Sequence, residues 1–213
     1  MSHTLGTRQA QKLKTRRALL DAALELLEEQ SLSSLGLREV TRAAGVAPTA
    51  FYRHFHSIPD LGVALVEEAL DSLHPMIRTI VSTPGDTDRR ITRAVGLIAG
   101  HVDRYPAHVR FIARERHGGV QPVREAIRDQ LARFAEEVAE ALAADPVSEG
   151  WGRDDLLMLA QIYVDLMLST ASLFLETPAD APRERERVAR LASRRLRLIG
   201  IGRRHWLDAP VTA

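Results

Sequence analysis

The stretch RAAGVAPTAFYRHF, residues 42–55, decides how the N-terminal part of this chain folds. Gly45 can take the left-handed conformation that ends a helix without a steric cost, and Val46 can fill the corner that follows. Pro48 suits the first turn of a new helix, because its missing N–H is not needed there. The pattern predicts two short helices that meet at a tight turn, which is the layout of a helix-turn-helix.

The second of these helices is expected to have a buried side and a free side. Phe51 and Phe55 are four residues apart, so they share one helical face and should pack inward. The remaining side chains then point away from the core, and a helix-turn-helix places its second helix in the major groove of DNA. Two rings that hold the helix from behind explain why aromatic residues gather here, in a chain that is only 5% aromatic.

The free side carries groups that can contact DNA in different ways. Tyr52 and His54 can donate hydrogen bonds to phosphate oxygens, which sets position rather than sequence. The small Thr49 and Ala50 allow close approach and contact with a thymine methyl group. Arg53 can reach a guanine or a phosphate, and the ring of Tyr52 has the alternative of packing within the small domain. With basic residues from outside this segment, the expected DNA-binding residues are Lys14, Arg16, Arg38, Pro48, Thr49, Ala50, Tyr52, Arg53 and His54.

The composition is that of a globular protein without cysteine chemistry. The chain has 213 residues, 45% of them hydrophobic, a net charge of +1 and no cysteine. Disulfides, thiolate metal sites and cysteine nucleophiles are therefore excluded. No apolar run reaches the roughly 18 residues of a membrane span, and the N-terminus lacks the apolar segment of a signal peptide. We expect a cytoplasmic protein that does not enter a membrane.

Patterns typical of enzymes do not occur in the sequence. The histidines form no His-Glu-x-x-His motif of a metal enzyme. Neither a glycine-rich phosphate loop nor a nucleophile elbow is found. The sequence predicts a protein that is not an enzyme and that has no cofactor and no metal.

Apolar residues recur with the helical period along nearly the whole chain, and no alternating strand of convincing length occurs. The fold class is therefore predicted to be all-α, with a bend at Pro75 and a strong break at TPGDTD, residues 83–88. A helix-turn-helix domain is expected over 1–58, linked through the long helix that begins near residue 60 to a larger domain over 59–213. The predicted helices span about 10–30, 37–44, 48–54, 60–82, 87–104, 106–116, 121–144, 153–176 and 183–204.

Basic residues gather at both ends of the chain. The first 20 residues contain no acid and five bases, which are Arg8, Lys12, Lys14, Arg16 and Arg17. This group adjoins the predicted helix-turn-helix and can meet DNA phosphates. The arginine-rich segment 183–204 can also meet phosphate, but a solvated helix face is the interpretation we favour.

Three segments resemble the DNA-binding domain of the TetR family of transcriptional repressors. They are TRRALLDAALELL (15–27), LREVTRAAGVAPTAFYRHF (37–55) and DLGVALVEEAL (60–70). The resemblance implies a three-helix DNA-binding domain, a fourth helix that leads into a ligand-binding body, and a dimer that binds a palindromic operator. The chain departs from the family at Gly36 and Ala47, where the family often has serine or threonine as a helix cap.

A narrower resemblance includes RFIARERHGG, residues 110–119, and is to TetR-type repressors of unsaturated fatty acid synthesis and desaturation. It implies a small-molecule effector such as a long-chain acyl-CoA. Arg114 and Arg116 can then bind the phosphates of the CoA headgroup bidentately. An ion pair with Glu115, or ordinary solvation of a helix end, is an equal alternative. A TetR-type repressor of drug efflux or catabolic genes, with a drug-like or aromatic ligand, remains the second functional hypothesis.

The helix over 153–176 is apolar around nearly its whole circumference, so it should be buried on all sides. A partner chain would cover one side and a core or a ligand cavity the other. The family resemblance implies that the last two helices of each chain form a four-helix bundle. The expected dimer-interface residues are Leu166, Ser169, Leu173, Leu191, Arg195 and Leu198. The expected ligand-binding residues, each with plain core packing as its alternative, are Ile98, Val102, Phe111, Arg114, Arg116, Phe134, Tyr163 and Met167.

Overall fold

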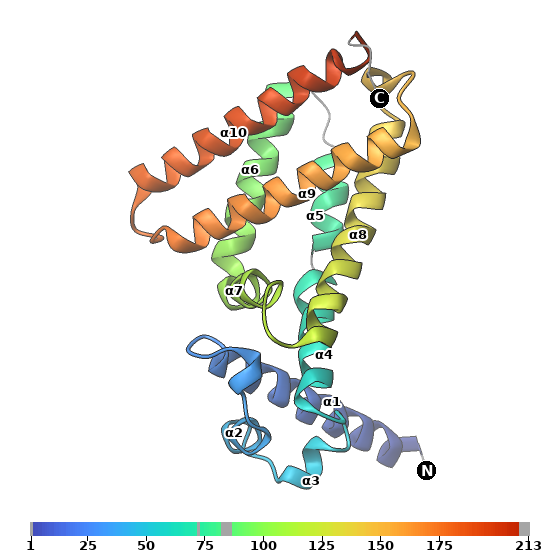
Figure 1. Cartoon of the computed structure of the whole chain (residues 1–213). Helices are drawn as coiled ribbons and strands as arrows, with labels where there is room; N and C mark the ends of the chain where they lie inside the picture. Colours follow the sequence, from blue (N-terminus) through green and yellow to red (C-terminus); the bar gives the residue numbers. More distant parts are fainter. Residues whose placement is uncertain (1, 72, 82–86, 209–213) are drawn as a thin grey trace. The chain divides into compact units, whose positions relative to one another are not determined.

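The computed structural model describes residues 2–71, 73–81 and 87–208, which form α-helices and short 3-10 turns and include no strand (Figure 1). The all-α prediction is confirmed. The α-helices are α1 (Ser2–Leu26), α2 (Leu37–Ala43), α3 (Pro48–Phe51), α4 (Ile58–Asp71), α5 (Leu73–Val81), α6 (Thr87–Arg104), α7 (Pro106–Glu115), α8 (Gln121–Ala143), α9 (Arg153–Glu176) and α10 (Pro182–Arg204). The 3-10 turns are η1 (Leu32–Ser34), η2 (Pro146–Ser148) and η3 (Trp206–Asp208).

Several predicted boundaries need correction. The first helix begins at Ser2 rather than near residue 10. The first helix ends at Leu26 rather than near residue 30, and α3 ends at Phe51 rather than at residue 54. The segment predicted as one long helix is two, with α4 ending at Asp71 and α5 beginning at Leu73. Pro75 lies in the first turn of α5, where its missing N–H costs no helical hydrogen bond. The predicted break TPGDTD lies mostly outside the described residues.

The turn between α2 and α3 has the geometry that the sequence predicts. Gly45 is left-handed, with φ of 66°. Its N–H donates to the carbonyl oxygen of Arg42 at 3.1 Å, and the N–H of Val46 donates to that of Thr41 at 2.9 Å. This pair of bonds is the Schellman motif, which satisfies the last carbonyls of α2 and turns the chain toward α3.

The chain divides into two compact units. The first contains the residues up to Leu70 together with Arg110–Arg128, and the second contains Asp71–Val109 and the chain from Asp129 onward. The end of α7 and the start of α8 belong to the same unit as the N-terminal helices, which was not expected from the sequence. The functional division into residues 1–58 and 59–213 stays a prediction.

Within the first unit, the segment 110–128 makes buried contacts with the chain between α1 and α2 and with α4. Glu115 accepts a hydrogen bond from the backbone N–H of Leu32 at 3.0 Å. Arg114 donates to the carbonyl oxygens of Leu27 at 2.8 Å and of Gln30 at 2.7 Å, just beyond the end of α1. A Cβ at Gly62 of α4 would lie 2.5 Å from a methyl group of Leu32 and 2.8 Å from one of Val123, so glycine permits this close approach.

The second unit is built around α6, α9 and α10, which contact one another (Figure 1, green, orange and red). Its core includes Val95, Ile98 and Val102 of α6, with Phe174 of α9 and Ala192 of α10. Among the described helices, α9 is long and apolar enough to cross a membrane by length and composition alone. A core helix of a helical domain has the same properties, and α9 packs against two neighbours here.

Candidate DNA-binding surface and ligand cavity

The recognition segment, defined here as residues 47–55, has one held side and one free side. Phe51 and Phe55 are 0% and 2% exposed, and their ring centroids lie 5.6 Å apart. This confirms that both rings pack inward. On the other side, Tyr52 is 61% exposed and Thr49 and Arg53 are exposed as well. Thr49, Tyr52 and Arg53 therefore lie on the outer surface of the recognition segment, and the two buried phenylalanines hold its other side against the core.

The N-terminal end of α3 has no side-chain cap. Ala47 occupies the cap position and makes no side-chain hydrogen bond, and Pro48 follows at the first helical position, where it is exposed. At α2, the cap residue is Gly36, whose N–H donates to Glu39 at 3.5 Å. The two departures from the family pattern are thus accommodated by a proline and by a glutamate.

His54 is more enclosed than Tyr52 and Arg53. It is half-buried, and its Nδ1 atom is buried without a partner among the described residues. Burial, followed by the positive charges of Lys12, Arg16 and Arg53, holds the pKa of His54 below its ordinary value. The imidazole is therefore neutral at neutral pH, and it can offer DNA one N–H donor without a charge.

Helix α1 supplies basic side chains beside the recognition segment. Arg16 is half-buried, with its guanidinium carbon 4.9 Å from the ring centroid of Phe55, a cation–π contact. Lys14, like Arg38 of α2, is exposed. Arg17 is engaged differently, because it pairs with Glu68 at 2.9 Å. The first unit thus brings α1 next to the residues expected to contact DNA.

The second unit contains a cavity of about 300 Å³, lined by residues of α5, α6, α8, η2, α9 and α10. This volume lies at the lower end of the ~300–1,000 Å³ range typical of ligand pockets. Most of the lining is aliphatic. Of the residues predicted to bind ligand, Ile98, Tyr163 and Met167 line the cavity, and so does Leu166, which was predicted for the dimer interface.

The other predicted ligand residues lie elsewhere. Val102 belongs to the α6 core, and Phe134 is 0% exposed with its ring centroid 4.5 Å from that of His74. Phe111, Arg114 and Arg116 belong to the first unit. Arg114 donates to the carbonyl oxygens of Leu27 and Gln30 beyond α1, a role that was not among the alternatives predicted for it, and its binding to phosphate stays a prediction.

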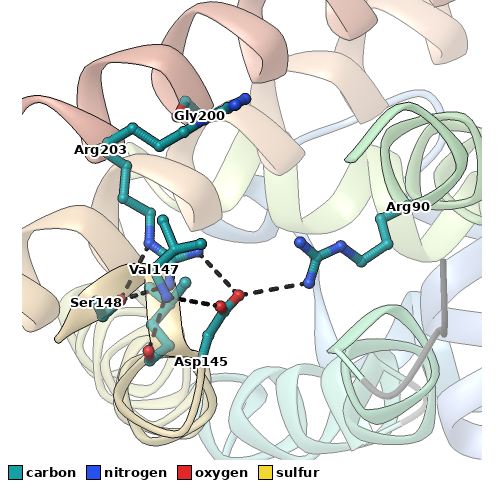
Figure 2. A network of polar contacts seen from close by, with 8 residues as sticks. Arg90, Asp145, Val147, Ser148, Gly200 and Arg203 are labelled. Atoms are coloured by element: carbon teal, nitrogen blue, oxygen red, sulfur yellow. Dashed lines mark hydrogen bonds and ion pairs between the residues drawn. The ribbon is translucent and has the colours of Figure 1, made fainter. Parts of the chain in front are cut away.

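A polar network of residues that line the cavity was not predicted from the sequence. The Oδ2 atom of Asp145 lies 3.4 Å from NH1 of Arg90 and 3.3 Å from NH1 of Arg203 (Figure 2). Arg203 also donates from Nε to Ser148 Oγ at 3.1 Å. In the sequence, Asp145 lies between the predicted helices over 121–144 and 153–176, and no spacing connects it with Arg90 or Arg203.

Ionisation within this network is shifted by burial and by charge. Burial opposes the charged form of Asp145, but the N–H of Val147 and the guanidinium groups of Arg203 and Arg90 outweigh it, so the pKa of Asp145 lies below its ordinary value. Burial raises the pKa of the Tyr163 phenol. Asp145 is therefore an anion at neutral pH, and Tyr163 keeps its O–H donor.

The outer faces of α9 and α10 are partly apolar. Of the residues predicted for the dimer interface, Ser169, Leu191, Arg195 and Leu198 are exposed, and Leu166 and Leu173 are half-buried. Further apolar side chains are exposed on the same two helices, namely Met158, Ile162 and Ile201. In the single chain, α9 is therefore not buried on all sides.

The comparisons with known proteins agree with this arrangement. Residues 19–65 match the tetR family of bacterial regulatory proteins, so the chain has a TetR-family DNA-binding domain at its N-terminus. The fold is similar to that of FadR from Bacillus subtilis, solved in complex with stearoyl-CoA, at a TM-score of 0.66 and 14% identity over 86% of this chain and 96% of that one.

Two more solved structures share the fold. The fatty acid degradation regulator FadR from Bacillus halodurans has a TM-score of 0.66 and 16% identity over 84% of this chain and 94% of its own. A transcriptional regulator from Rhodococcus sp. Rha1 has a TM-score of 0.68 and 18% identity over 88% and 96%, respectively. At these identities the similarity establishes the architecture of both units.

Proposed function

We propose that the chain is a ligand-responsive transcription regulator of the TetR type, most simply a repressor, which binds a palindromic operator as a homodimer and senses an acyl-CoA or a related lipid. The observation that carries this proposal is the recognition segment. Its two phenylalanines are buried while Thr49, Tyr52 and Arg53 are exposed, within a matched TetR-family domain. That arrangement suits insertion into a major groove.

The exposed apolar residues of α9 and α10 support a dimer. Leu198 is 70% exposed, Ile201 49% and Ile162 43%. A group of large apolar side chains on adjacent helices is typical of a protein interface. A second copy of the chain would cover it with the same residues, because a twofold interface is self-complementary. A twofold dimer also matches the symmetry of a palindrome, whose half-sites lie about one helical turn apart.

The cavity supports a small-molecule effector with a large apolar part. Its lining is mostly aliphatic, with Ile98, Met167 and Leu196 among its residues. The shared fold with a FadR that binds stearoyl-CoA, and the resemblance of residues 110–119 to regulators of unsaturated fatty acid synthesis, favour a lipid. A catalytic function has no support from the family match, which is to regulatory proteins.

Helix α8 contributes residues to both units, and we infer that it carries the effect of a ligand from the second unit to the first. Val138 and Leu142 of its later turns line the cavity, and Val123 and Ile127 of its first turns are buried in the first unit. Val123 in turn approaches α4 at Gly62. A ligand that favours one position of α8 would thereby change α4 and the separation of the two recognition segments, provided that its affinity differs between the two states.

Selection of DNA from a random library by the purified protein tests the DNA-binding part of this proposal. We expect enrichment of a palindrome, and binding that weakens as salt increases. A protein that enriches no symmetric sequence would contradict it. Mass spectrometry of small molecules released by denaturation tests the ligand: acyl-CoA or fatty acid supports a lipid, and a drug-like or aromatic compound would replace it.

A further inference from the structure

The cavity has an excess of positive charge. Its lining, within the described residues, contains the three arginines Arg90, Arg203 and Arg204 and one carboxylate, Asp145. Charged groups in an apolar cavity are costly unless opposite charges compensate them. Because Asp145 is already ionised and can neutralise only one guanidinium, the lining lacks counter-charge.

One carboxylate oxygen of Asp145 contacts two arginines. Figure 2 shows Arg90 and Arg203 approaching Asp145 from opposite sides, and both are bound to the same Oδ2 atom, at 3.4 Å and 3.3 Å. Charge-assisted hydrogen bonds of this type are ordinarily about 2.7–2.9 Å long. Both contacts are therefore weak ones, and Asp145 leaves the two cations incompletely compensated.

The two arginines differ in how firmly they are held. Arg203 is 8% exposed, and it donates to Ser148 Oγ from both Nε and NH2 and to the carbonyl oxygen of Leu142 at 3.4 Å. Arg203 therefore fastens α10 to η2. Arg90 bonds to Asp145 and to no other described residue. Most of the five donors of its guanidinium therefore have no partner among the described residues.

We propose that Arg90, which lines this cavity, binds the anionic head of an amphipathic ligand, whose apolar chain occupies the aliphatic part of the lining. Arg90 supplies a planar pair of donors that suits a carboxylate or a phosphate oxygen pair. Tyr163 lines the same cavity and keeps a phenolic O–H that can donate to the same head. The inference rests on the proposed role of this cavity as the effector site, and adds the charge of the effector.

The same geometry argues against a cationic ligand. The one lining carboxylate, among the described residues, is Asp145, and two guanidinium groups already share it. A cation would meet three arginines without a free partner of opposite charge. The effector of this cavity is therefore an anion, and the two natural sources of that anion are the carboxylate of a free acyl chain and the phosphates of an acyl ester such as acyl-CoA.

Four probes with the same ten-carbon chain separate these chemistries: decanoate, decanoyl-CoA, 1-decanol and decyltrimethylammonium. Binding to the full chain without DNA is measured by calorimetry and by tryptophan fluorescence. The chain has two tryptophans, and Trp151 and Trp206 pack together with ring centroids 5.8 Å apart. The N–H of Trp151 donates to the carbonyl oxygen of Ser148 at 3.0 Å, so the emission reports on the residue that holds Arg203.

We expect at least one of the two anionic probes to bind about tenfold or more tightly than 1-decanol, and the cation to bind least. If decanoate binds more tightly than decanoyl-CoA, the site recognises a free carboxylate. If decanoyl-CoA binds more tightly, the site recognises phosphate. Arg90→Gln should remove the preference for the anion and leave the affinity for 1-decanol unchanged. Arg93→Gln, an exposed arginine one turn along α6 that does not line the cavity, is the matched control and should retain it.

Four results would overturn the inference. Three concern the wild-type chain: equal affinity for the anions and 1-decanol, tightest binding of the cation, or no binding of any probe. The fourth is an Arg90→Gln variant that still prefers the anion. The comparison of probes on the wild-type chain does not depend on whether a variant folds. DNA affinity is measured separately. An Arg90-dependent preference for an anion without any effect on operator binding would retain this site and contradict the proposed ligand response. Operator binding without an anion preference would contradict this anion site and retain the proposed DNA-binding function.

Discussion

Glu115 and Leu32 are joined by a buried hydrogen bond, in which the N–H of Leu32 donates to Oε1 of Glu115 at 3.0 Å and both residues are 1% exposed. They lie 83 positions apart in the sequence. The bond attaches the end of α7 to the chain between α1 and α2. Its contribution to the first unit can be measured directly.

Glu115→Ala should lower the free energy of unfolding by about 1–3 kcal/mol, because it leaves the buried N–H of Leu32 without an acceptor. Glu115→Gln keeps a carbonyl oxygen at the same place and should cost less. Urea unfolding followed by circular dichroism measures both. Equal losses in the two variants would contradict a role for the hydrogen bond.

Gly118→Ala should also destabilise the first unit, because the added Cβ would lie 2.2 Å from Oε2 of Glu115 and 3.2 Å from its Cα. Overpacking of this kind typically costs about 1–3 kcal/mol. In a Glu115→Ala background the carboxylate is absent, and the same change should cost less. Additive losses in the double variant would show that the two residues do not interact.

Tyr52→Phe and Arg53→Ala should each weaken binding to the selected operator while leaving the unfolding curve unchanged, because both side chains are exposed. We expect losses of about tenfold, the effect of one hydrogen bond to a charged group. If Arg53 contacts a phosphate, its loss should reduce the slope of log affinity against log salt concentration by about 1. If Arg53 contacts a guanine, its loss should relax the sequence specificity at one operator position. Arg133→Ala, an exposed arginine of α8 in the second unit, is the control. Unchanged affinity in both variants would contradict the placement of the recognition segment.

Leu198→Glu should convert the protein from a dimer to a monomer. Leu198 is 70% exposed in the single chain, so the charge disturbs no core, but it would be buried without a partner in a dimer of α9 and α10. Light scattering coupled to size-exclusion chromatography measures the mass, and we expect it to halve. Leu13→Glu is the matched control, because Leu13 is 61% exposed but lies on α1, and this variant should remain a dimer. A dimer that survives Leu198→Glu would place the interface elsewhere.

Stability should decrease as the pH falls through the histidine range, about pH 7 to pH 5. The folded protein holds the pKa of His54 below its ordinary value, first by burial and then through Lys12, Arg16 and Arg53. The unfolded chain therefore takes up the proton more readily, and stability present above the ordinary pKa is lost as the pH falls. His101 is shifted in the same direction, by burial and by His108. The contribution of His54 is therefore measured as the difference between the free energies of unfolding of wild type and His54→Gln at each pH. Parallel curves of this free energy against pH would contradict a contribution from His54.

The helix-turn-helix could be predicted from local sequence features. Gly45, Pro48 and the pair Phe51 and Phe55 act over a few residues, through backbone conformation and helical spacing, so their consequences can be read locally. The helix boundaries of the body followed from periodicity for the same reason. Where the boundaries were wrong, as at the end of α3, the last turn is irregular rather than helical.

Which polar residues contact one another depends on the packing of distant segments and could not be predicted from the sequence. Arg90 and Asp145 are 55 positions apart, Asp145 and Arg203 are 58 apart, and each alone has the appearance of a solvated helix or loop residue. The same holds for Arg114, which was a candidate phosphate ligand in the sequence and donates to carbonyl groups near the end of α1 in the structure. Packing of helices sets these encounters, and it depends on how whole apolar faces fit together, which no local spacing specifies.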